Sequence, residues 1–120
     1  MNQVIEAPAM KNKWGIASVL SPDSFEKLKS IMYEKTFEKG AVLYWEGDPA
    51  DKLYFIKSGF VRITKTTEAG RSITFYLHRS GDLFGQIDPY PDSRHIFNAE
   101  ATERTQTGVI QWKDLEILLW

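Results

Sequence analysis

The chain contains no cysteine, which excludes disulfides, thiol redox sensing and cysteine-ligated iron–sulfur clusters. Histidine is nearly as scarce, with only His78 and His95. A metal site of the cupin type needs two or three clustered histidines and a carboxylate, so an enzyme of this class is not supported. Long apolar runs are absent too, since none approaches the ~18 residues of a membrane span. We therefore expect a non-catalytic protein with no metal, no cofactor and no membrane partner.

The charge and the composition are those of an ordinary globular domain. A formal charge of −1 argues against a broad phosphate-binding face, and the first twenty residues lack the apolar core of a secretory signal. The 120 residues, 42% of them apolar, suffice for one domain with a single core. Aromatic residues make up 13%, which suits a β-rich core. We expect one cytoplasmic domain that by itself binds nucleic acid poorly.

Short alternating apolar runs, separated by glycine or aspartate, predict a series of β-strands joined by tight turns. Between Phe37 and Ile63 the breaks fall at Gly40, Gly47-Asp48 and Ser58-Gly59. Regular short strands of this kind favour a jelly roll or barrel over an α/β fold. The predicted strands cover residues 34–38, 41–45, 52–57, 60–67, 71–78, 83–86, 96–103 and 106–112.

A helix is predicted before the first strand. Ser21-Pro22-Asp23 is a typical helix start, with a hydroxyl at the N-cap and proline at the first helical position. Apolar residues then follow at helical spacing, which predicts an amphipathic helix over residues 22–33 that packs on the domain. These residues are Phe25, Leu28, Ile31 and Met32.

The two ends of the chain differ from the strand region between them. Residues 1–20 are expected to form an N-terminal arm, followed by a β-roll domain with its helix over residues 21–112. Residues 113–120 start like a helix and finish strongly apolar. A free end of this kind would expose a large apolar patch, so it either folds back onto the roll or is the start of a truncated longer helix. We expect the second.

One spacing pattern runs through these turns and strands over roughly residues 20–120. Its members are Lys39-Gly40, Leu43, Glu46-Gly47-Asp48, Asp51, Leu53-Tyr54-Phe55-Ile56, Ser58-Gly59, Val61-Arg62-Ile63, Gly81-Asp82-Leu83-Phe84-Gly85 and Ala99-Glu100-Ala101-Thr102. The combined pattern resembles the effector-binding domain of Crp/Fnr-type bacterial transcription regulators. The resemblance implies a mainly β fold, the double-stranded β-helix or jelly roll of cyclic-nucleotide-binding domains, with flanking short helices.

In that family the roll is followed by a long dimerisation helix and then by a helix-turn-helix that enters the major groove of DNA. Neither is expected in this chain. The resemblance therefore implies a sensor domain whose own partner is an unidentified small-molecule effector. Promoter DNA would be bound only through the missing C-terminal domain, and a homodimer is expected for the full-length protein.

The resemblance also places the effector site after the strand that ends near Gly85. Nucleotide-binding members have a Gly-Glu-Leu turn there and, after a short helix, an Arg-Ser or Arg-Thr pair. The arginine and the helix N–H groups neutralise the cyclic phosphate, and the glutamate holds the ribose hydroxyl. In this chain the candidate effector-binding residues are Gly85, Gln86, Ile87, Arg94 and His95.

The departures from that pattern all weaken the case for a cyclic nucleotide. Gln86 replaces the glutamate with a neutral amide, and counting back from Ala101 puts His95, not Arg94, at the arginine position. Two acids would repel an anion and two prolines remove N–H donors: Asp88, Asp92, Pro89 and Pro91. We expect an effector other than a typical cyclic nucleotide. A functional cyclic-nucleotide-binding regulatory domain of a signalling protein is the alternative.

Three side chains leave alternatives open. Arg94 either holds an anion or pairs at the surface with Asp92 or Glu100. His95 is either a responsive group, since imidazole titrates near neutrality, or a solvated loop residue. His78 lies in an alternating strand, on a face that we expect to be outer or polar, which argues against a metal or haem role.

The remaining conspicuous residues are expected to have structural roles. Gly47, Gly59, Gly70 and Gly81 are predicted turn residues, and Asp48 and Asp51 are predicted to cap loop N–H groups. The aromatic residues are predicted to form the core or inter-strand pairs, with one or two lining the effector cavity: Trp45, Tyr54, Phe60, Phe75 and Tyr76.

Overall fold

The computed structural model describes residues 22–85 and 93–119. In chain order the elements are α1 (Pro22–Ser30), β1 (Met32–Phe37), β2 (Val42–Tyr44), β3 (Lys52–Ser58), β4 (Phe60–Thr66), β5 (Ser72–Arg79), β6 (Leu83–Gly85), β7 (Asn98–Ala101), β8 (Thr105–Gln111) and α2 (Trp112–Leu119). Each predicted strand is found in place, with small shifts at its ends. The predicted arm over residues 1–20, and Gln86 and Ile87, lie outside the described residues.

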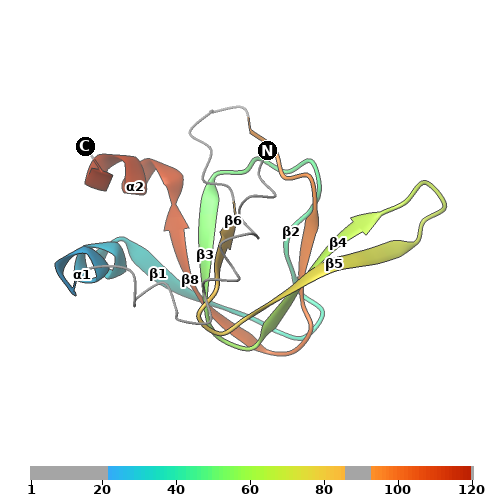
Figure 1. The fold of residues 1–120 in the computed structure, drawn as a ribbon, viewed down its shortest axis with the longest axis horizontal. Coiled ribbons are helices and arrows are strands. Elements are labelled where there is room, and N and C mark those ends of the chain that lie inside the picture. The colour runs from blue at the N-terminus through green and yellow to red at the C-terminus, as the bar shows by residue number, and fades with distance from the viewer. Residues whose placement is uncertain (1–21, 86–92, 120) are drawn as a thin grey trace.

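The eight strands of the described residues form two antiparallel sheets (Figure 1). Strands near the middle of the sequence pair with each other, and strands nearer its two ends pair outside them. Sheet A has the order β1-β8-β3-β6, and sheet B has the order β2-β7-β4-β5. The first strand thus pairs with the last, the second with the seventh, the third with the sixth and the fourth with the fifth. A double ribbon folded over in this way is a jelly roll, and the predicted fold is confirmed.

The core lies between the two sheets and consists of side chains on the inward face of each. Tyr54 of β3 lies opposite both Val109 of β8 and Phe84 of β6, so one row of side chains crosses sheet A on its inner face. On sheet B, Ile63 of β4 lies opposite Ala99 of β7. The buried cluster consists of Phe37, Tyr44, Tyr54, Ile56, Val61, Ile63, Phe84, Ala99, Ala101 and Val109.

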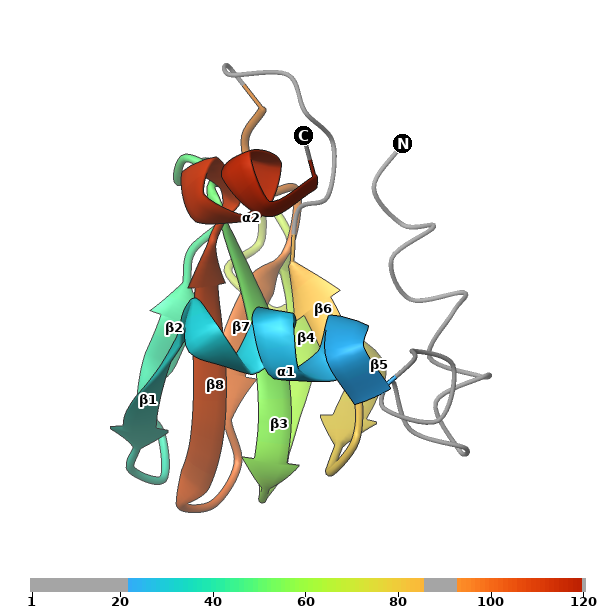
Figure 2. The same cartoon turned by 90° about the vertical axis from the view of Figure 1, so that its left-hand side faces the viewer.

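Both helices lie on the outer side of sheet A. Figure 2 shows α1 crossing in front of this sheet and α2 continuing from the end of β8, and α1 contacts both β1 and α2. Leu53 and Ile110, paired on the face away from the core, are buried on this side. The predicted helix over 22–33 is too long: α1 ends at Ser30 because Met32 is already paired with Ile110 in β1.

Gly59 forms the corner at which the chain leaves sheet A and enters sheet B. Its φ is +101°, a conformation that favours glycine. A Cβ atom at this position would meet the backbone carbonyl oxygen of Arg104 at 2.7 Å and also clash with Thr105. Gly70, in the β4–β5 turn, has a φ of +81° but no atom within 4 Å of the same position. Both glycines are therefore turn residues, as predicted, but only one is crowded.

We predict that Gly59→Ala destabilises the domain more than Gly70→Ala does. A left-handed conformation costs an alanine about 1–2 kcal/mol. Only at Gly59 is a clash with the backbone added, which should bring the loss of unfolding free energy to roughly 3 kcal/mol. Urea denaturation of the two variants measures the difference, and equal losses would contradict the crowding of this corner.

Candidate functional site

The segment before β7 is held against the β2–β3 loop by backbone hydrogen bonds. The Gly47 N–H donates to the His95 carbonyl oxygen (2.7 Å), and the His95 N–H donates to the Asp48 carbonyl oxygen (2.9 Å). The Ala50 N–H donates to the Ser93 carbonyl oxygen (2.9 Å). This antiparallel bridge keeps the segment extended, so adjacent side chains point to opposite sides.

Arg94 and His95 consequently face in opposite directions. Arg94 is exposed, and its Nη1 donates a hydrogen bond to the Gly47 carbonyl oxygen at 3.0 Å. His95 is only 5% exposed, and its ring stacks on Tyr44 with 3.5 Å between ring centroids and an interplanar angle of 7°. It is therefore His95 that points into the roll.

Two expectations for these residues are wrong. His95 is not a solvated loop residue, because the stack on Tyr44 buries its ring. Arg94 does not pair with Glu100, whose Oε1 instead accepts a hydrogen bond from Arg62 Nη2 at 2.6 Å. The other suggested partner, Asp92, lies outside the described residues.

Burial determines the charge state of His95. It lowers the pKa of this imidazole from the ordinary 6.5 to about 4, against an opposing effect of Asp48 and Asp51. The ring is therefore neutral at pH 7. A neutral imidazole at this inward position donates or accepts hydrogen bonds but contributes no positive charge toward an anion.

His95 is the first of a run of ring contacts that crosses the roll. Tyr44 contacts Tyr54 and Phe84 at centroid distances of 5.9 and 6.4 Å, and Tyr54 stacks on Phe84 at 5.5 Å. Phe84 in turn stacks on His78 at 4.3 Å. Tyr44 and His78 come from sheet B, whereas Tyr54 and Phe84 come from sheet A. The run therefore joins the two sheets.

His78 lies in the interior, so the prediction of an outer or polar face is wrong. Its side chain is 0% exposed, and its Nδ1 lies 3.1 Å from Asp82 Oδ2. The same oxygen accepts the N–H of Arg79 at 3.0 Å. Asp82, four residues after His78, was the sequence signal that could have indicated a buried histidine, because a carboxylate can satisfy the hydrogen-bonding needs of a buried imidazole. The apolar alternates of β5, Ile73, Phe75 and Leu77, are exposed, as are its polar residues Ser72, Thr74 and Arg79.

The chain with this geometry also matches a known family. The model of the cyclic nucleotide-binding domain matches residues 34–119. The chain belongs to the cyclic nucleotide-binding domain family. Its relatives include Crp/Fnr-type regulators, so the resemblance found in the sequence is confirmed.

The relatives of this cyclic nucleotide-binding domain are longer proteins. The chain is 31% identical over 101 residues to the anaerobic regulatory protein of Bacillus subtilis, a match that covers 83% of this chain and 42% of the relative. It is 28% identical over 87 residues to the cyclic AMP receptor protein of Thermus thermophilus, covering 72% of this chain and 40% of the relative. The chain thus spans less than half the length of these relatives.

Solved structures of the family share the fold. The catabolite activator protein of Thermus thermophilus is similar with a TM-score of 0.76 and 26% identity, over 84% of this chain and 47% of that one. The sensor domain of the regulator DNR from Pseudomonas aeruginosa gives a TM-score of 0.72 at 23% identity, over 83% of this chain and 67% of that one. The second likeness bears on the fold alone.

The structure describes three of the five candidate residues in this cyclic nucleotide-binding domain. Gly85 ends β6 with a φ of +124°, and a Cβ there would meet the Lys52 carbonyl oxygen at 2.5 Å, so the close approach of β3 requires glycine. His95 is buried and Arg94 is exposed. The last two, Gln86 and Ile87, lie outside the described residues and stay predictions.

The other predictions for this region had mixed outcomes. Asp48 caps a loop as predicted, because its Oδ2 accepts the Trp45 N–H at 2.9 Å. Tyr54 lies in the core, and burial raises the pKa of its hydroxyl. Trp45 and Phe75 are each 58% exposed, so neither lies in the core. Phe75 instead forms a ring pair with Phe97, with 5.1 Å between the ring centroids.

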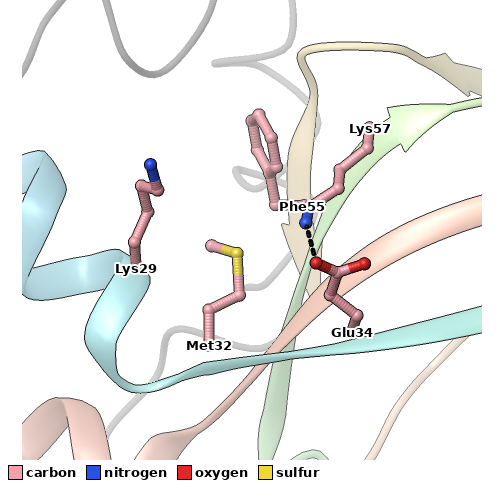
Figure 3. Close-up of a pocket in the computed structure, with 5 residues that line it drawn as sticks. All are labelled: Lys29, Met32, Glu34, Phe55 and Lys57. Carbon is pink, nitrogen blue, oxygen red and sulfur yellow. Dashed lines mark ion pairs between the residues drawn. The ribbon is translucent and has the colours of Figure 1, made fainter.

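A separate open pocket lies on the outer face of sheet A, away from the ring contacts (Figure 3). It is lined by Lys29, Met32, Glu34, Phe55 and Lys57, with 3.1 Å between Lys57 Nζ and Glu34 Oε2. Gly108 of β8 pairs with both Glu34 and Phe55, and the Met32 side chain packs where a side chain at Gly108 would lie.

Two further properties of the described residues bear on possible functions. Residues 22–85 and 93–119 contain no group of three or more histidine, aspartate or glutamate side chains arranged to hold a metal ion. None of the helices in this part of the chain is long and apolar enough to cross a membrane.

We predict that His95 makes the domain sensitive to mild acid. Because the folded-state pKa lies below the unfolded value of 6.5, the unfolded chain takes up the proton first as the pH falls. The unfolding free energy should therefore fall between about pH 6.5 and 4, by at most about 3 kcal/mol. His95→Phe keeps a ring on Tyr44 but cannot bind a proton. Urea denaturation at pH 7, 5.5 and 4.5 should show a smaller loss for this variant, and parallel losses would contradict the assignment.

Proposed function

We propose that this chain is the effector-binding sensor domain of a Crp/Fnr-type transcription regulator, and that its effector is not a typical cyclic nucleotide. Membership of the cyclic nucleotide-binding domain family and similarity to full-length regulators support the first part. The second part rests on the residues that enclose the interior of the roll. No catalytic role is proposed for this domain.

The orientation of Arg94 and His95 is the observation that carries the proposal. A cyclic phosphate needs a cation within hydrogen-bond reach to offset its charge. Arg94 is turned outward onto the Gly47 carbonyl oxygen, and the inward place is taken by a neutral imidazole. An arginine at this point of the roll would have to replace the stacked ring of His95.

For a full-length regulator, this proposal also implies how the chain is divided, which partners it binds and where it is located. Residues 21–112 form the effector-binding domain, residues 1–20 an arm before it, and residues 113–120 the first part of a helix that continues toward a dimer partner. Promoter DNA and a second copy of the protein are the proposed partners of that longer chain. The proposed location is the cytoplasm.

A functional cyclic-nucleotide-binding domain is the alternative, and one observation favours it. The similar protein of Thermus thermophilus is named a cyclic AMP receptor protein. Gly85, at the start of the segment where nucleotide-binding members have their Gly-Glu-Leu turn, is buried against β3 and has the backbone conformation that only glycine adopts readily. The two functions differ in whether a cyclic nucleotide stabilises the domain.

We predict that neither cAMP nor cGMP raises the melting temperature of the domain. A ligand that binds only the folded state stabilises it by mass action, so titration up to millimolar concentration detects even weak binding. A panel of small anions, 2-oxo acids and neutral ring compounds is tested in parallel. A rise with another compound supports a sensor with a different effector, and the absence of any rise counts against an effector-binding domain.

The variant Arg94→Ala serves as the internal comparison in this titration. Its exposed hydrogen bond to the Gly47 carbonyl oxygen predicts a loss of only ~0–1 kcal/mol of stability. Saturable stabilisation by cAMP that disappears in Arg94→Ala would overturn the proposal and establish the alternative.

A further inference from the structure

The described interior of the roll offers no fixed positive charge. The buried polar side chains are Thr64, His78, Asp82, His95, Asn98, Thr105 and Thr107, and no lysine or arginine of residues 22–85 and 93–119 is buried with them. The one buried carboxylate, Asp82, is matched to His78 at 3.1 Å. An anion entering this part of the roll would lose its hydration without gaining a cation in return.

Aromatic faces dominate the same interior. Tyr44, Tyr54 and Phe84 are each buried, and their rings lie within 5.5–6.4 Å of one another. The face of Tyr44 is covered by a flat five-membered ring, the His95 imidazole, at 3.5 Å and 7°. This slot therefore already holds a small planar heterocycle supplied by the chain itself.

The slot is closed by His95 itself, which is only 5% exposed. A ligand therefore reaches the face of Tyr44 only if the His95 side chain rotates away from it. An aromatic stack contributes about 0.5–1.5 kcal/mol beyond burial, which a larger ring can match.

We propose that the effector of this domain presents an uncharged planar ring, of the size of one or two fused heterocycles, and binds by replacing the His95 imidazole on Tyr44. This inference rests on the proposed sensor function and names the chemical class of its ligand. The neutral state of His95 at pH 7 agrees with it, because an uncharged ring replaces an uncharged ring.

The test compares compounds that share a planar ring and differ in charge. Nicotinamide and nicotinate also differ little in shape, whereas adenine and AMP form a second pair in which the anion is much larger. Thermal shift gives the affinities. The His95 Hε1 resonance, displaced by the ring current of Tyr44, reports directly whether the imidazole leaves the stack. We expect the neutral member of each pair to bind at least tenfold more tightly and to move this resonance.

Variants at His95 sharpen the test. His95→Ala removes the internal competitor and should tighten binding of the neutral member by about 2–10-fold, the equivalent of the lost stack. His95→Arg places a cation at the inward position and should reverse the preference in favour of the anionic member. Arg71 is exposed in the β4–β5 turn, so Arg71→Ala provides a matched control. It should leave the affinities for the neutral and the anionic member of each pair unchanged. Circular dichroism verifies that each variant is folded.

The outcomes separate this inference from the proposed function. Preference of the wild-type domain for the anionic members, or failure of His95→Ala to bind any ring compound, overturns the inference. If a 2-oxo acid stabilises the wild-type domain while the neutral rings do not, the sensor function stands and the ligand class is wrong. If no compound of either class stabilises the wild-type domain, the sensor function falls as well.

Discussion

Contact between aromatic rings across the two sheets is the interaction on which the rest of this structure depends. Phe84 is 0% exposed and touches rings from both sheets, with Tyr54 on its own side and Tyr44 and His78 on the other. Two curved sheets need large side chains between them to exclude water, and aromatic residues supply that area with few rotatable bonds. The same rings determine what else the interior can hold, because they leave flat apolar faces and few charges.

The sequence predicted the order and type of the elements because their signals are local. Glycines such as Gly59, with its positive φ, mark turns that no other residue makes as easily, and alternation between them marks strands. The α1 boundary was less accurate, since Met32 continues the helical spacing but gains more by pairing with Ile110. The sheet partners themselves came only from the resemblance, because a period of two does not say which strand lies alongside.

The candidate site was harder to predict, because alternation identifies two faces of a strand but not which one is inside. In β5 the apolar Ile73, Phe75 and Leu77 suggested the inner face, yet the inner face carries His78. The imidazole is tolerated there because Asp82 lies within hydrogen-bond distance. For Arg94 and His95 the orientation depends on the bridge to the loop at Gly47 and Asp48, which no local pattern contains. Counting from Ala101 nevertheless favoured His95 as the inward residue, in agreement with its burial.

The nested pairing of the strands has a consequence for how the polypeptide acquires its structure. Only β4 and β5 are both neighbours in sequence and partners in a sheet by a short turn, so this hairpin can form within microseconds. Every other pairing spans a longer loop, up to the contact of β1 with β8. Such high contact order is typical of folding in milliseconds to seconds. Because β8 lies between β1 and β3 in sheet A, a ribosome must complete almost the whole domain before this sheet can assemble. Until then the apolar residues of its strands stay exposed on the nascent chain, which makes that chain prone to aggregation.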